Sequence, residues 1–340
     1  MQKLIKAERG AIYVEFLLVF IPIFLVWMAI MQLALFSSAR LTVQHAAIRG
    51  VRSAIVVIDD DPQHYNNVPR GCLTGGNGNS VDGLLGRIAE TALNNTPGKI
   101  KKEAGLNKQS LDRVSSRYNN AGPRMQAIRN AVYTPLLTLA PDPRFLWDED
   151  SMRLAVGFMP ESRMLSGLIY NKGGTAVTFP SSEQGTDSQY QIAKDANVTV
   201  RVTYLYHCAV PLVSYLMCKP MDTILGGLGK KLKEKFENVE DLTFDRNDFL
   251  DYQHEDTSSE EESEADKKAK IIPRELAHSE VPGLQILFGA KGQRFKVFRE
   301  QATLPNQASN YKYKSELENS EEPVPCEPPK DREDDDAEAN

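Results

Sequence analysis

Cysteine and histidine are scarce in this 340-residue sequence, and neither is spaced for metal binding. The four cysteines form no CxxC pair, and no histidine lies near them at zinc-finger spacing, although His207 adjoins Cys208. The three adjacent carboxylates of residues 59–61 lack the alternating spacing and the glycine of an EF-hand loop, which favours a solvated turn there. We therefore expect no metal site.

Sequence signatures of catalysis are also missing. No histidine pairs with a glutamate as HExxH, and GxSxG and Cys/His nucleophile patterns do not occur. The glycine-rich string TGGNGNS, residues 74–80, is not followed by GK[ST], so it is not a phosphate-binding P-loop. These absences lead us to expect a protein that is not an enzyme and needs no cofactor.

The sequence has no cluster of basic and aromatic residues, which argues against a nucleic-acid partner. The net charge of -6 comes mostly from residues 316–340, where eleven acidic residues face two basic ones. Such a segment cannot bury enough apolar surface to fold alone, so we expect a disordered acidic tail, with an acidic interaction tail as the alternative. Residues 254–270 are similarly polar and predict a solvated loop.

One long apolar run is present, at residues 11–36. As a helix it is about 39 Å long, enough to cross a hydrocarbon core of about 30 Å, and Pro22 is tolerable within it. Lys3, Lys6 and Arg9 precede the run, which favours a cytoplasmic N-terminus and places the rest of the chain outside.

A carboxylate, Glu15, lies near the start of this apolar run. Burial of a charge in a membrane costs roughly 2.5–3.5 kcal/mol at the centre of a helix, and a plain anchor has no use for that cost. Together with the basic leader, Gly10, Ala11, Glu15 and Phe16 match the prepilin-type pattern. The string ERGAIYVEFLLVFIPIFLV resembles TadE-like minor pseudopilins of the tight-adherence, or type IVc, pilus.

The resemblance implies that a prepilin peptidase cuts between Gly10 and Ala11, which places Glu15 at position five of the mature chain. Glu15 and Phe16 would then support assembly, because the carboxylate can meet the new N-terminal ammonium of a neighbouring subunit. The implied partners are the prepilin peptidase, the major and other minor pilins, and the inner-membrane assembly platform. The implied location is the bacterial inner membrane, with a periplasmic C-terminal domain, and after assembly a pilus-associated or extracellular one. The alternative is an uncleaved single-pass anchor, with Glu15 as its boundary residue, carrying a periplasmic binding or adhesin protein.

The remaining pattern predicts an α+β fold with an antiparallel sheet. Residues 37–58 form an amphipathic extension of the membrane helix, whose stripe of small and branched apolar residues suits either the core of the molecule or a subunit interface. The expected order of parts is a leader at 1–10, the membrane helix at 11–36, its extension at 37–58 and an extracytoplasmic domain at 59–315. Within it we expect helices at 81–95 and 121–139, and strands at 174–180, 197–206, 284–289 and 292–304.

Cys208 and Cys218 flank AVPLVSYLM and predict a disulfide outside the membrane, with two buried thiols as the alternative. Closing this short loop stabilises the fold by roughly 2–3 kcal/mol in the chain-entropy description. For Cys72 and Cys326, pairing and two free thiols both stay open.

Overall fold

The computed structural model describes six continuous stretches and several short pieces of the chain. The stretches are residues 2–73, 122–141, 163–181, 188–193, 196–225 and 293–306, with 272, 275–276, 278–280, 285, 288 and 326 as the short pieces. The expected helix at 81–95 and the polar loop at 254–270 lie outside the described residues, as does the acidic tail except for Cys326.

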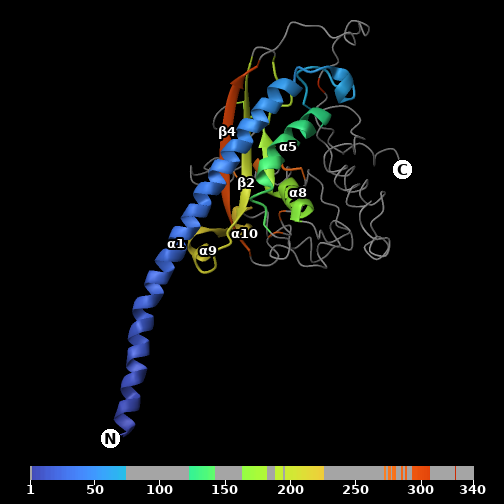
Figure 1. The fold of residues 1–340 in the computed structure, drawn as a ribbon. Coiled ribbons are helices and arrows are strands. Elements are labelled where there is room, and N and C mark those ends of the chain that lie inside the picture. The colour runs from blue at the N-terminus through green and yellow to red at the C-terminus, as the bar shows by residue number, and fades with distance from the viewer. Residues whose placement is uncertain are drawn as a thin grey trace, which may run out of the picture.

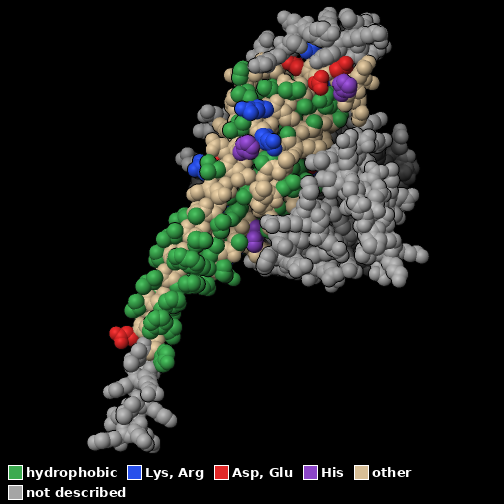
Figure 2. Space-filling model, viewed as in Figure 1, with side chains coloured by type: hydrophobic (Ala, Val, Ile, Leu, Met, Phe, Trp, Pro, Cys, Tyr) green, Lys and Arg blue, Asp and Glu red, His purple; other side chains and the backbone are tan. Residues whose placement is uncertain are grey.

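Helix α1, Gln2–Val57, is the longest element and gives the protein its shape. Its N-terminal half projects from the body as a rod, whereas its C-terminal half lies along the sheet (Figure 1). Apolar side chains cover the projecting half in the space-filling view (Figure 2). The predicted membrane helix and its amphipathic extension are therefore one continuous helix.

The body is built on a four-stranded antiparallel sheet in the order β1-β2-β4-β3. Strand β2, Asn197–His207, pairs with β4, Arg294–Pro305, along its whole length, from Asn197 opposite Pro305 to His207 opposite Phe295. The short strands β1, Thr175–Thr178, and β3, Lys219–Pro220, complete the sheet. Because 197–206 alternates valine with polar residues before it reaches the tyrosines, it was the clearest strand in the sequence, and the structure confirms it.

The other elements agree with the expected α+β class, with one error. Helix α5, Pro123–Leu136, falls within the predicted 121–139, and its first residue is proline, which suits the first helical position. The prediction of a strand at 284–289 was wrong at its two described residues, since Gln285 and Phe288 are helical. Both side chains are buried, and a short buried apolar run does not distinguish strand from helix by its period. Helix α8, Arg163–Gly174, precedes β1 directly.

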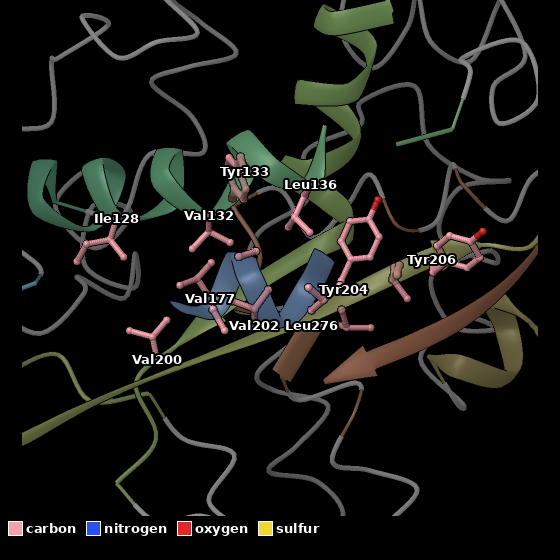
Figure 3. Packing of buried hydrophobic residues seen from close by; sticks show 14 of the residues in the cluster. Ile128, Val132, Tyr133, Leu136, Val177, Val200, Val202, Tyr204, Tyr206 and Leu276 are labelled. Atoms are coloured by element: carbon pink, nitrogen blue, oxygen red, sulfur yellow. The ribbon is translucent and has the colours of Figure 1, made fainter. Parts of the chain in front are cut away.

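The apolar stripe of the α1 extension belongs to the core of the molecule. Its members are all at most 1% exposed and pack in one cluster with α5 and the sheet: Ala39, Val43, Ala46, Ala47, Val51 and Ala54. Figure 3 shows Val132 and Leu136 of α5 near Val202 of β2. The choice left open by the sequence, core or subunit interface, is thus decided in favour of the core for this face.

Small residues on this stripe allow α1 to lie very close to its neighbours. A Cβ atom at Gly50 would come within 2.7 Å of Val132 Cγ2 and 3.2 Å of Val200 Cγ1. Real Cβ atoms essentially never come within 3.0 Å of another group, so any larger residue at Gly50 would force Val132 to move. Gly50 therefore marks the point where α1, α5 and β2 meet.

The C-terminal end of α1 is capped by a buried arginine from α5. The Arg124 guanidinium donates to the carbonyl oxygens of Val57, Ile58, Asp60 and Val68, the last two at 3.0 and 3.1 Å. These acceptors include carbonyls at the helix end, where no further helical turn supplies a donor and where the helix dipole favours a cation.

The expected solvated turn at residues 59–61 was only partly correct. The chain does turn there, and Asp61 caps the following short helix by accepting from the Gln63 amide at 3.0 Å. Asp59, however, is buried, with its carboxylate 4.0 Å from Arg70. Folding of the chain back over the helix end, with Arg124 beneath it, removes this carboxylate from water.

A buried charge cluster lies on the face of β2 that points away from α1 and α5. The Glu275 carboxylate lies 3.1 Å from Arg201 and 2.5 Å from Arg299, and accepts from the Thr203 hydroxyl at 2.8 Å. Glu275 and Arg201 are almost completely buried, so each needs the other to offset the cost of losing water. This cluster ties residues 275–276 to the sheet.

Candidate functional site: the projecting apolar helix

The projecting part of α1 exposes a continuous apolar surface. Between Tyr13 and Leu35, sixteen large apolar side chains are exposed: Tyr13, Val14, Phe16, Leu17, Leu18, Val19, Phe20, Ile21, Ile23, Phe24, Val26, Trp27, Ile30, Met31, Leu33 and Leu35. Monomeric soluble proteins rarely expose so large a contiguous apolar patch (Figure 2). The helix is long and apolar enough to cross a membrane as a single span, and this segment lies near the N-terminus.

Aromatic rings form a stripe along one side of this rod. Phe16, Phe20, Phe24 and Trp27 stack in sequence, with successive ring centroids 5.5, 5.8 and 6.1 Å apart. Their spacing of four, four and three residues places them on one helical face. Of these four residues, only Phe16 was predicted from the sequence to have a role, although the four-four-three spacing is visible there.

The four residues of the prepilin-type pattern lie on this same rod. Gly10 and Ala11 are within α1, and Glu15 and Phe16 follow as exposed residues. Glu15 is exposed, and none of the described elements of the body lies beside the pattern (Figure 1). Any partner of this carboxylate in the membrane must therefore come from outside the described part of the chain.

The rod joins the body through three contacts that the sequence analysis did not anticipate. Gln32 is fully buried and its Oε1 accepts from the Val210 amide at 3.3 Å. Phe36 then packs edge-to-face on Tyr206 and Phe298, each at 5.9 Å between centroids. Finally, Arg40 forms an ion pair with Glu300 on β4 at 2.6 Å.

Two disulfides are present in the structure. Cys208 and Cys218 are joined across ten residues, around the short helix α9, Val213–Met217, and Cys72 is joined to Cys326 across 254 residues. The first closes a loop beside α1, and the second ties one residue of the tail to the loop after α1. Disulfides of this kind persist mainly in oxidising compartments.

Several tyrosines of the body are buried, and two of them form hydrogen bonds within the core through their hydroxyl groups. Burial raises the pKa of Tyr133, Tyr170 and Tyr204 well above the usual value for tyrosine. Tyr133 donates to Glu280 and Tyr170 to the Leu205 carbonyl, so both serve the packing of the core. Within the part of the chain that the structure describes, no three His, Cys, Asp or Glu side chains are grouped to hold a metal ion.

Comparison with known proteins gives a match that covers the rod and the following part of α1. Residues 10–52 match the family model described as TadE-like protein. This segment is similar to that family. The TadE-like match runs from Gly10 through the rod and into the packed part of α1, and ends before α5 and the sheet. It indicates a component related to tight-adherence pili. No curated protein and no solved structure matches the chain significantly.

Proposed function

We propose that this protein is a minor pseudopilin of a tight-adherence pilus, held in the membrane by α1 and later packed through that helix with other pilin subunits. The observation that carries the proposal is the coincidence of the TadE-like match with the exposed apolar rod. A rod with an uncovered apolar surface needs lipid or other apolar helices around it. A pilin exchanges the first environment for the second.

Glu15 is the assembly residue in this proposal. It lies five residues beyond Gly10 on an exposed part of the rod, and no described residue of the body reaches it. A new amino group at Ala11 of a neighbouring subunit would pair with the carboxylate by a charge-assisted hydrogen bond. Such a pair offsets desolvation and sets the axial register of one helix on the next.

Processing between Gly10 and Ala11 requires the peptidase to receive a stretch that α1 holds as helix. Glycine in a helix interior costs about 1 kcal/mol relative to alanine, so Gly10 is a weak point at which the helix opens. Glycine also presents no side chain to the peptidase cleft. A bulky residue at this position opposes both steps.

N-terminal sequencing and intact mass of the membrane-extracted protein test the processing step. We expect a mature chain that begins at Ala11, and a Gly10→Leu variant that keeps its leader. The matched control, Ala7→Leu, adds the same side chain three residues earlier and should be processed normally. A wild-type chain that begins at Met1 would contradict the proposal.

Incorporation of Glu15→Ala into sheared fibres tests the assembly step. We expect normal leader removal but a several-fold loss of the subunit from fibres, because the register contact is missing. Gln44→Ala, at an exposed polar position of α1 outside the apolar rod, is the control. Normal incorporation of Glu15→Ala would refute the assembly role.

The second candidate is an uncleaved single-pass anchor for a periplasmic binding or adhesin protein. The observation that favours it is the size of the body, which continues beyond the TadE-like match with its own sheet and two disulfides. An intact leader, together with absence from fibres and normal piliation after deletion, would identify this alternative. Prepilin peptidase, pilins and the assembly platform are partners only under the first proposal.

A further inference from the structure

We propose that the loop closed by Cys208 and Cys218 is a second membrane-contacting element, which rests on the outer lipid surface beside α1. We call residues 208–218 the collar loop. The inference rests on the proposed function in one respect, that α1 crosses a membrane. Its ligand is the interface of an anionic bilayer, and neither the family match nor the prepilin-type pattern extends to it.

The collar loop carries an exposed apolar group that has no counterpart elsewhere in the described body. Outside α1, the large apolar side chains that the described residues leave exposed all lie here: Leu212, Tyr215 and Leu216, at 57%, 67% and 82%. Single exposed apolar residues are ordinary, but three within five residues on one loop form a patch. Leucine and tyrosine suit the boundary between lipid tails and headgroups.

The collar loop lies at the height where the rod leaves the membrane. Twenty residues of helix span about 30 Å, the thickness of the hydrocarbon core, so a span that starts at Glu15 ends near Leu35. The exposed apolar surface of the rod also ends at Leu35. Gln32, within the last turn of that span, holds the loop through its bond to the Val210 amide. Figure 1 shows α9 beside α1, at the end of the described body from which the rod projects.

Buried residues and the disulfide hold the collar loop so that its apolar side chains remain exposed. Val213 and Ser214 of α9 are buried and anchor this helix, and the disulfide joins the first and last residues of the collar loop. Leu212 has a φ of +63°, a conformation that side chains other than glycine rarely adopt and that costs free energy. A leucine held there and exposed to water gains nothing in the isolated molecule, whereas contact with lipid would offset both costs.

Three basic residues lie in the strand segments next to the patch. Residues 207–220 and 293–298 contain Lys219, Arg294 and Lys296 and no aspartate or glutamate. Arg294 lies 4.2 Å from the centre of the Tyr215 ring and donates to the Tyr215 and Cys218 carbonyls. Lys219 and Lys296 are exposed. This charge attracts anionic lipid headgroups at the depth where the apolar side chains enter the interface.

A neighbouring copy of the chain is the rival occupant of this patch. Lipid is favoured because the patch lies at the level where the exposed apolar surface of the rod ends, and because basic residues near it would repel one another in a twofold contact between copies. A twofold contact between two copies through this patch would place these cations against each other. The distinction is measurable when each membrane particle holds a single chain.

Tryptophan fluorescence in lipid nanodiscs with one chain per disc tests the proposal. In a full chain with Trp27→Phe and Trp147→Phe, the probe is Leu216→Trp, and Tyr215→Trp is a second probe that keeps an aromatic ring. The control is Val56→Trp, at a site on α1 that is 64% exposed and lies about 36 Å beyond Gln32 along the helix. We expect blue-shifted emission and several-fold stronger quenching by brominated lipids for the two loop probes than for the control.

Water-like emission of both loop probes, with quenching no greater than for Val56→Trp, would overturn the proposal. So would quenching protection that appears only with two chains per disc, since the occupant would then be a second copy. A chain with Trp27 as its sole tryptophan separates this failure from that of the proposed function. If Trp27 is quenched and the loop probes are not, only the collar loop is refuted; if Trp27 is not quenched either, the membrane span itself is refuted.

Discussion

Arg124 shows how a single buried side chain can close a long helix. Its guanidinium satisfies carbonyl oxygens on both sides of the chain reversal after α1 and stacks 4.4 Å from the centre of the Tyr65 ring. Desolvation lowers the pKa of Arg124, and electrostatic interactions with Tyr65, Asp60 and Asp59 oppose that effect. Because arginine starts so high, the side chain stays a cation at the negative end of the α1 dipole.

Substitution Arg124→Met should lower the free energy of unfolding by about 3 kcal/mol, because it leaves several buried carbonyl oxygens without a donor. Arg52→Met, at an exposed position of α1, is the control and should change stability by no more than ~0.5 kcal/mol. Chemical denaturation of the detergent-solubilised proteins measures both. Equal effects of the two variants would show that Arg124 does not cap the helix.

His207, at the end of β2, makes the stability of the fold depend on pH. Burial lowers the pKa of His207, and its hydrogen bond with Gln293, 2.8 Å long, opposes the shift. A base whose pKa is lower in the folded protein binds fewer protons there than in the unfolded chain. Its contribution to stability is therefore complete above its ordinary pKa of about 6.5 and is lost as the pH falls below that value.

We expect the wild type to lose more stability between pH 7.5 and 5.5 than a His207→Gln variant does. Gln63→Ala, at an exposed position without a titratable side chain, should keep the wild-type dependence. Denaturant midpoints at the two pH values give the comparison. A His207→Gln protein with an unchanged or steeper loss on acidification would contradict this assignment.

At the scale of elements, α1 does two jobs with one continuous helix. Its first part exposes apolar residues on all sides, and its second part buries one stripe, with Gly50 at the closest approach to β2 and α5. The helix passes from exposed to partly buried between Gln32 and Ala39. There Gln32 and Phe36 contact the body through a hydrogen bond and an aromatic contact. A helix that is apolar all round needs an apolar environment, whereas an amphipathic one covers a core.

The Cys208–Cys218 bond belongs to this scale because it holds α9 against the start of the sheet. The double variant Cys208→Ser and Cys218→Ser should lose about 2–3 kcal/mol of stability, since the ten-residue closure no longer restricts the unfolded chain. Peptide mapping without reductant should recover the two cysteines in one linked peptide pair. Alkylation of both thiols in unreduced protein would exclude the bond.

At the scale of the whole molecule, the rod and the body share few contacts. Between Tyr13 and Met31 no described side chain is buried, and the first buried one is Gln32. The body has its own cluster of buried residues built from α1, α5 and the sheet. The structure therefore separates a part that seeks apolar surroundings from a part that folds around its own core.

Removal of residues 1–30 should yield a protein that stays in solution without detergent and unfolds within ~1 kcal/mol of the full chain, because the contacts of Gln32 and Phe36 are kept. Size-exclusion chromatography and near-ultraviolet circular dichroism provide the measurement. Removal of residues 1–41 is the comparison, since it takes away Gln32, Phe36 and Ala39, and should be less stable. A 31–340 protein without a native near-ultraviolet spectrum would show that the rod supports the core.

Local pattern was sufficient for the elements with strong periodicity. The helix at 121–139 and the strands at 197–206 and 292–304 were predictable because apolar residues recur on one face of each. The strand expected at 284–289 failed at Gln285 and Phe288, where a short buried run carried no decisive period. The solvation of Asp59 was also misjudged, because its burial depends on chain folded back from elsewhere.

The sequence by itself determined the apolar helix, the prepilin-type pattern around Gly10 and Glu15, and the α+β class, because composition and spacing along the chain carry these features. Only the tertiary structure decided that the small-residue stripe of α1 faces the core, that Arg124 closes the helix, and that the collar loop lies beside the rod. Contacts of this kind join residues far apart in the chain, such as Gln32 and Val210. No local pattern encodes such pairs, since each side chain gains its free energy only once the partner segment has been brought to it.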